Sequence, residues 1–501
     1  MYFKKIILLA ITIVYCLSAT AQFKLSGKII DYDGMEELKI NIPLVFGFYK
    51  ENSVAIPVAK DGSFNIVLPI KESKFANLIY KRIFHTLLLN PTKNLTANLR
   101  DTTLILTGGT ALAENKVMQK VNVEEYPFFL KNEGNNEFAK LPLLQLKERV
   151  LKPYFSQRDE KIKIVNTSTL TDKHKLLIIT ELKSIVYNYI NDFARTRLAD
   201  KKKNDSLIVY VFDHSDKNPV IFPAGPQYFA YVRNYLGYLE TKAFMQKKPD
   251  QLSPTEKIPY FNLTIDSATK LIKSFGKPYW RWIGANNNLS LKIVEPYTYQ
   301  EIINLYNAKD LKQMEGLVNA FNITFTRSAY QTDITQKIGI LRKRLLENES
   351  NTNIKIFDGY EKLSSIYDVI KTLKGKVVYV DVWGTWCGPC KEELTYNPQL
   401  KEKFAKQDVA FVYLDMDEED KDFTWREFIK VNGLTGVHIR KNRKTIEPFW
   451  LELLAKTNDK EQYYPQYFIF DKNGNLVVSK ANRPSDTNLL YQQIEQYLKV
   501  N

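Results

Sequence analysis

The sequence predicts three domains of different classes: a small β-rich domain, a mainly α-helical middle domain and a C-terminal α/β domain. Apolar residues alternate over residues 22–110, recur every three or four positions over residues 111–346, and form alternating strand and helix segments over residues 354–501. A polar stretch at residues 347–353 predicts a linker before the last domain. With 501 residues and 44% hydrophobic content, the chain is globular in composition and too long for one core.

Residues 1–21 have the pattern of a cleavable signal peptide. A basic start and an apolar run over residues 6–17 precede Ala19-Thr20-Ala21, which fits an A-x-A cleavage site. The apolar run is shorter than the ~20 residues that a transmembrane helix needs. We therefore expect cleavage before Gln22, export to the periplasm and no transmembrane segment in the mature chain. The sequence around Cys16 fits a lipid anchor poorly, and membrane association in the cell envelope remains the alternative.

The β-rich prediction rests on short alternating segments that turn residues separate. Candidate strands cover residues 23–30, 41–46, 63–68, 87–89 and 103–106. Asp31-Tyr32-Asp33-Gly34 predicts a turn, and Asp61-Gly62 predicts a hairpin between Val58 and residues 63–68. We expect a small sandwich or a partial barrel.

The middle domain is predicted from amphipathic helical patterns. The clearest apolar faces span residues 176–193, 228–239 and 302–317. Pro219, Pro223 and Pro226 break the chain before the second of these helices. The aromatic residues on these faces indicate core packing rather than a platform for a ligand.

The C-terminal domain is predicted to alternate strands and helices, which favours a sheet with helices on both faces. Expected strands cover residues 354–357, 376–382, 409–414, 467–470 and 476–479, and expected helices cover residues 363–373 and 489–498. A further helix is expected to start at the cysteines. Apolar residues near Trp425 and at residues 449–454 predict two more helices before the fourth of these strands.

The chemistry is predicted to lie at Cys387 and Cys390, which follow the expected strand that ends at Trp383. Cys387 falls at the start of a helix, where unpaired N–H groups and the positive helix end stabilise a thiolate. We therefore expect a lowered pKa for Cys387, which makes it the nucleophile. Cys390, one turn later, is placed to resolve a mixed disulfide. Pro389 suits the first helical turn, where a missing N–H costs nothing.

A metal site is the alternative explanation of two cysteines at this spacing. Zinc needs two further ligands, and loss of Cys16 with the signal peptide leaves no other cysteine. His438 is the one histidine of residues 354–501 and has no partner at ligand spacing. A purely structural disulfide across so short a loop would be unusual. We expect no metal and no cofactor, only a redox-active disulfide between Cys387 and Cys390.

The stretch Trp386-Cys387-Gly388-Pro389-Cys390, preceded by Asp381, resembles thioredoxin. Together with the signal peptide and the domain order, the chain resembles the TlpA/ResA-like thiol–disulfide oxidoreductases of the thioredoxin superfamily, which are common in Bacteroidetes. The resemblance is specific over residues 354–501 and weaker over residues 22–110, and the middle domain matches in position and helical character. It implies a thioredoxin fold with a central mixed sheet flanked by helices.

The resemblance also implies roles for residues around the dithiol. Cys387 corresponds to the attacking cysteine and Cys390 to the resolving one. Asp381 corresponds to a buried acid beneath the site, where burial raises the carboxyl pKa and the group can accept a proton from Cys390. Trp386 packs beside the disulfide in the family, and Gly388 and Pro389 complete the contact surface for a substrate.

Two further matches lie later in the chain. Tyr464-Pro465 matches the cis-proline loop, whose backbone can pair with an extended substrate segment. Tyr464 is bulkier than the residue usual there, which bears on substrate preference. Glu418 matches a glutamate near the site in the cytochrome-maturation branch of the family, and a solvated loop is the alternative interpretation. A role in cytochrome c biogenesis follows from that match alone.

The charge pattern and the motif together predict the function. The net charge is +15, but the lysines are scattered and the longest run, Lys201-Lys202-Lys203, is typical of a solvated helix end, so we expect no nucleic-acid partner. The Gly-Pro pair between the cysteines matches thioredoxin, whose potential of about −270 mV is reducing. We expect a periplasmic reductase of protein disulfides that receives electrons from a membrane thiol donor. A disulfide isomerase, or a binding protein for an envelope partner or polymer with an accessory redox domain, are the alternatives.

Overall fold

The computed structural model describes residues 22–45, 52–130, 137–214 and 225–499, and the expected signal peptide lies outside them. The chain forms two compact units, the first comprising the residues up to Leu271 with Trp280–Gln300, and the second Ile272–Tyr279 with Glu301–Asn501. Within the described ranges, no helix has the length and apolar character needed to cross a membrane.

The N-terminal part of the first unit is a sandwich of two four-stranded sheets, with strand orders β4-β1-β7-β8 and β3-β2-β5-β6. Its strands are β1 (Phe23–Ile30), β2 (Leu38–Asn41), β3 (Ser53–Ile56), β4 (Ser63–Leu68), β5 (Lys74–Tyr80), β6 (Ile83–Leu89), β7 (Asn94–Arg100) and β8 (Thr103–Gly108). Alternate residues of both sheets, such as Leu25 and Leu78, meet in one apolar core. The alternating sequence pattern thus produced the expected sandwich.

Two local predictions for this domain have different outcomes. Asp61-Gly62 does form a turn, closed by the Ala59 N–H donating to the Ser63 carbonyl at 2.8 Å. Val58 and Phe64 pair as an antiparallel bridge across this turn, which confirms the expected hairpin, although in the sheets β3 pairs with β2 and β4 pairs with β1. The strand expected at residues 41–46 is wrong, since β2 ends at Asn41 and residue 46 lies outside the described residues.

The rest of the first unit is helical, as predicted. Its helices are α1 (Leu112–Lys120), α2 (Leu143–Leu146), α3 (Lys152–Asn166), α4 (Asp172–Arg197), α5 (Lys201–Asp213), α6 (Tyr228–Gln246) and parts of α7 (Ile265–Asn288) and α8 (Leu291–Asn307). Apolar residues of α1 and α4, including Met118 and Leu177, pack with Phe75 and Leu88 of the sandwich. The lysine run lies at the start of α5, and of the three prolines expected to break the chain, Pro219 and Pro223 lie outside the described residues.

The helices that precede the α/β domain belong to the second unit. The single apolar face predicted over residues 302–317 is divided, because α8 ends at Asn307 and α9 (Leu311–Thr324) begins after its N-cap Asp310. Helix α10 (Gln331–Glu349) continues into the predicted linker, so residues 347–349 are helical. In α9 the Lys312 N–H donates to the Glu427 carboxylate at 3.0 Å, which ties this helix to the α/β domain.

The α/β domain is built on a mixed six-stranded sheet of order β14-β13-β10-β11-β12-β9. Its strands are β9 (Ile354–Ile356), β10 (Val377–Trp383), β11 (Val409–Asp415), β12 (Gly436–Arg440), β13 (Gln466–Phe470) and β14 (Leu476–Val478). The central strand β10 is buried along its whole length, parallel to β11 and antiparallel to β13. Its alternate residues face two separate cores, Val378 and Val380 on one side and Val377 and Tyr379 on the other.

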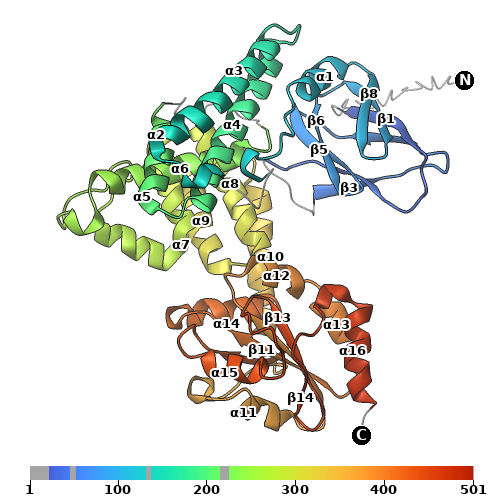
Figure 1. The fold of residues 1–501 in the computed structure, drawn as a ribbon, viewed down its shortest axis with the longest axis vertical. Helices are drawn as coiled ribbons and strands as arrows, with labels where there is room; N and C mark the ends of the chain where they lie inside the picture. The colour runs from blue at the N-terminus through green and yellow to red at the C-terminus, as the bar shows by residue number, and fades with distance from the viewer. Residues whose placement is uncertain (1–21, 46–51, 131–136, 215–224, 500–501) are drawn as a thin grey trace, which may run out of the picture. The chain divides into compact units, whose positions relative to one another are not determined.

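Helices cover both faces of this sheet (Figure 1), and they are α11 (Tyr367–Ile370), α12 (Gly388–Leu394), α13 (Asn397–Lys403), α14 (Asp422–Val431), α15 (Glu447–Leu453) and α16 (Asn488–Leu498). This is the thioredoxin-type arrangement that the sequence predicted. The expected helix at residues 363–373 is confirmed in part, because an α-helix covers Tyr367–Ile370 and a 3-10 turn continues it to Leu373, whereas residues 363–366 are not helical. Strand β12 was not predicted, whereas α14 and α15 confirm the two extra helices.

Candidate active site

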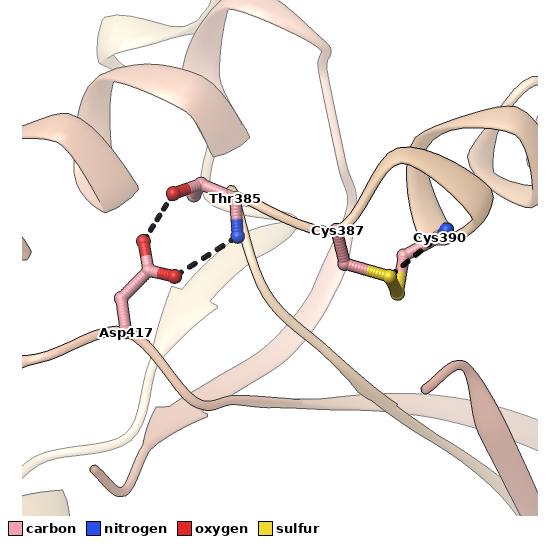
Figure 2. The surroundings of a disulfide bond; sticks show 4 residues. All are labelled: Thr385, Cys387, Cys390 and Asp417. Carbon is pink, nitrogen blue, oxygen red and sulfur yellow. Dashed lines mark hydrogen bonds between the residues drawn. A yellow bond between two sulfur atoms is a disulfide. The ribbon is translucent and has the colours of Figure 1, made fainter. Parts of the chain in front are cut away.

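Cys387 and Cys390 lie where the chain leaves the central strand. Strand β10 ends at Trp383, and Cys387 is the N-cap of α12 and forms a disulfide with Cys390. The Cys390 N–H donates to the Cys387 sulfur at 3.2 Å (Figure 2). This bond satisfies one of the free N–H groups at the helix start and would stabilise negative charge on the same sulfur.

The two cysteines and the residues between them differ in exposure. Cys387 is 4% exposed and Cys390 1%, while Gly388 and Pro389 are exposed. Pro389 lies in the first turn of α12, as expected. The helix ends at Leu394 and restarts as α13 at Asn397, so the break falls just before Pro398.

Asp381 is buried beneath this loop in β10, with 3% exposure, and it faces the core that includes Leu400 of α13. Its Oδ1 has no hydrogen-bond partner among the described residues. Burial raises the pKa of Asp381 well above its ordinary value, and the nearby Glu393 carboxylate raises it further. The prediction that Asp381 is a buried acid of raised pKa therefore agrees with the structure, and its catalytic role stays a prediction.

Lys401 of α13 supplies positive charge near Asp381 and was not predicted from the sequence. Burial lowers the pKa of Lys401 to about 7, and the Asp381 carboxylate opposes that shift. The Lys401 ammonium donates to the Thr435 carbonyl. Asp381 is thus acted on by a carboxylate, Glu393, which raises its pKa, and by Lys401, which lowers it. Glu393 is itself held by the N–H and hydroxyl of Ser485 at 3.0 and 2.9 Å.

Aromatic side chains border the disulfide. The peptide bond between Tyr464 and Pro465 is cis, as predicted. The Tyr464 ring meets Trp386 edge to face at 5.4 Å and Trp450 of α15 at 5.9 Å. Trp386 remains 49% exposed, so this ring is available to a bound substrate.

Asp417 is a residue of the site that sequence reasoning missed. It follows β11, and its carboxylate accepts hydrogen bonds from the Thr385 N–H at 3.0 Å and from the Thr385 hydroxyl (Figure 2). A Cβ on Gly384 would come 3.3 Å from an Asp417 oxygen and 2.7 Å from the Trp386 ring nitrogen, so this close approach requires glycine. The sequence signal was present as the acidic run Asp415–Glu418, but it did not indicate which acid turns inward.

Glu418, the acid singled out from the sequence, is exposed, and its main-chain carbonyl accepts from Arg440 at 2.8 Å. The carboxylate that contacts the cysteine loop is therefore that of Asp417, and the proposed role of Glu418 stays untested. Asp415 supports Asp417 by accepting its N–H at 3.0 Å. Burial raises the pKa values of Asp415 and Asp417, and the Arg440 guanidinium opposes both shifts.

His438 is a core residue. It is fully buried, stacks on Tyr413 at 4.9 Å, and its Nε2 lies 2.6 Å from the Leu434 carbonyl. Burial lowers the pKa of His438 to about 3, so the ring is neutral at physiological pH.

Comparisons with known proteins agree with this geometry. Residues 364–494 match the Redoxin family model. The thiol-disulfide oxidoreductase ResA of Bacillus thuringiensis is 33% identical over 131 residues, which is 26% of this chain and 66% of that protein. The ResA of Bacillus subtilis is 41% identical over 89 residues, 18% of this chain and 49% of its own length. The chain thus spans just under two thirds of the length of the first curated relative.

A solved structure shows a similar correspondence. The thioredoxin domain of a thiol-disulfide oxidoreductase from Bacteroides vulgatus aligns with 26% of this chain and 84% of its own, at 21% identity and a TM-score of 0.22. The Redoxin match falls within the C-terminal domain.

The sheet, the cysteine pair at the start of α12 and the cis-proline loop together define a thioredoxin-like oxidoreductase domain. The C-terminal domain belongs to the thioredoxin superfamily and is of the TlpA/ResA-like type.

Proposed function

We propose that the whole protein is a thiol–disulfide oxidoreductase of the cell envelope that reduces disulfides in other proteins. The observation that carries the proposal is the Cys387–Cys390 disulfide, in which the sulfur at the helix start accepts an N–H from its partner. A sulfur in this position is stabilised as a thiolate when the pair is reduced, and a thiolate is the form that attacks disulfides.

In the reduced protein, Cys387 attacks one sulfur of a client disulfide. A bond forms between Cys387 and the client, and the other client sulfur leaves as a thiolate. Cys390 then attacks the Cys387 sulfur, which releases the second client thiolate and restores the Cys387–Cys390 disulfide. Two electrons pass from the protein to the client, so the oxidised arrangement in Figure 2 is the product of this half-reaction.

The proton of the Cys390 thiol needs an acceptor in the second step, and we assign that role to Asp381. A carboxyl group of raised pKa, with a buried oxygen that has no partner among the described residues, is suited to hold a proton transiently. The Lys401 ammonium would limit the rise in the Asp381 pKa, so the acid can cycle between both forms.

The periplasm and a membrane thiol donor complete the proposal. The supporting observations are the signal-peptide pattern of residues 1–21 and the Gly388-Pro389 pair, which matches the reducing member of the superfamily. Because the periplasm is oxidising, a reductase there must receive electrons from outside that compartment. A role in cytochrome c biogenesis would make a cytochrome apoprotein the client.

The test is the equilibrium potential of the full mature chain against glutathione, together with its rate of insulin reduction. We expect a potential near that of thioredoxin, about −270 mV, and activity that Cys387→Ala abolishes. A potential near that of DsbA, about −120 mV, would make the protein an oxidase. Efficient rearrangement of a scrambled substrate would instead favour the isomerase alternative.

A further inference from the structure

Arg443 lies beside the redox site on a loop that does not belong to the cysteine motif. The loop joins β12 to α15, and the Arg443 guanidinium carbon lies 5.4 Å from the centre of the Trp386 ring. Trp386 directly precedes Cys387, and its ring also meets Tyr464 of the cis-proline loop. The cation is thus next to the surface on which a client must lie to reach Cys387.

Hydrogen bonds hold the backbone of this loop on both sides of Arg443. The Asn442 carboxamide oxygen accepts the N–H groups of Lys444 and Thr445 at 3.0 and 3.1 Å. The other end of the Asn442 side chain donates to Glu419 at 3.0 Å. The N–H of Lys441 donates to the Asp415 carbonyl at 2.8 Å, which fixes the start of the loop to β11.

The two preceding cations, Arg440 and Lys441, have partners, whereas Arg443 has none that is charged. Arg440 forms ion pairs with Glu419 and Asp422 at 3.1 and 3.3 Å, and the Lys441 ammonium donates to the Glu361 carbonyl at 2.8 Å. Across the described residues, no carboxylate lies within ion-pair distance of the exposed Arg443 guanidinium. Its contact with Trp386 is a cation–π contact, and the N–H groups of a guanidinium can bind a carboxylate in a bidentate manner.

We propose that Arg443 is a specificity-determining residue that favours client disulfides with an acidic residue close to the attacked cysteine. This inference rests on the proposed function. A client strand that pairs with the cis-proline loop advances ~3.3–3.6 Å per residue. A carboxylate two or three residues from the client cysteine therefore reaches the guanidinium, while the client cysteine reaches Cys387. A lysine at that place meets like charge and is disfavoured.

The test compares three disulfide-bonded peptides that differ only two residues from the cysteine, where they carry Glu, Gln or Lys. Second-order rates of their reduction by the full-length reduced protein are measured by stopped flow. We expect the Glu peptide to react about three to ten times faster than the Lys peptide at low salt, with the ratio falling as salt screens the charges. Reduction of the uncharged hydroxyethyl disulfide by the wild-type protein checks the proposed function separately.

Arg443→Gln should bring the Glu-to-Lys rate ratio close to one, while Lys444→Gln, which removes the same charge from the next exposed residue, should keep it. Because the ratio is measured within each variant, a partial loss of folded protein cancels. An unchanged ratio in Arg443→Gln, an equal loss in Lys444→Gln, or no preference in the wild type would overturn the inference. Failure to reduce hydroxyethyl disulfide would instead count against the proposed function.

Discussion

The carboxylate of Asp417 holds Thr385, two residues before Cys387, through both the main-chain N–H and the hydroxyl of that threonine (Figure 2). This contact links the end of β11 to the loop that carries the attacking sulfur. The loop therefore does not depend on the short helix α12 alone for its position.

Replacing Asp417 by alanine should destabilise the redox domain, because the Thr385 N–H would lose its acceptor. A buried donor without a partner costs about 1–3 kcal/mol, and because Thr385 is only part-buried we expect a loss at the lower end of that range. Urea unfolding followed by tryptophan fluorescence measures the loss. Thr385→Val is the matched control, since it removes the hydroxyl bond and keeps the N–H bond, and it should cost less. Equal stability of Asp417→Ala and wild type would show that the contact is not maintained in solution.

Replacing Asp381 by asparagine should slow the resolving step and remove its dependence on pH near the Asp381 pKa. A positioned acid or base contributes about 10²-fold or more to such a step. Lys401→Met should shift the pH profile upward, because the lysine now lowers the Asp381 pKa. Single-turnover release of the second client thiol as a function of pH measures both effects. A profile in Asp381→Asn identical to that of the wild type would remove Asp381 from the mechanism.

Glu427 should make the folded state less stable as pH rises. Burial raises its pKa to about 7 from an ordinary value of 4.5, although the Lys312 N–H partly offsets this shift. Between those values the folded state binds more protons than the unfolded state, so stability falls as pH increases through that window. Glu427→Gln keeps an oxygen acceptor for Lys312 and avoids the buried charge.

The difference in unfolding free energy between Glu427→Gln and wild type should therefore increase from pH 5 to pH 8 in favour of the variant. We expect an increase on the order of 1–2 kcal/mol after allowance for solvent screening. Urea unfolding at the two pH values gives this difference. A gain that is the same at both values would place the Glu427 pKa back in the ordinary range.

Much of the redox domain could be predicted from the sequence, because its signals are local. Apolar runs such as Val377–Val382 define buried strands, and the cysteine spacing defines a helix start. Strand β12 (Gly436–Arg440) was missed because it carries His438 and Arg440, which sequence patterns place in loops. Both are buried, and their contacts come from other parts of the chain: His438 stacks on Tyr413, and Arg440 forms ion pairs with Glu419 and Asp422.

The contacts of the site were harder to predict than its cysteines. Asp417 and Glu418 are neighbours of the same type, and only the course of the chain after β11 decides which one reaches Thr385. Lys401 and Arg443 are ordinary surface residues by sequence, and their positions near Asp381 and Trp386 depend on pairing between elements far apart in the chain. The prediction of a linker was wrong at residues 347–349, because α10 continues to Glu349.

The most direct test of the account is covalent trapping of a peptide disulfide by the reduced full-length protein, read by mass spectrometry. Cys390→Ala should accumulate a mixed disulfide at Cys387, because the partner that releases it is gone. Cys387→Ala should form little adduct under the same conditions, since the remaining sulfur is 1% exposed in the structure. Equal adduct formation by both variants would contradict the assignment of Cys387 as the attacking sulfur.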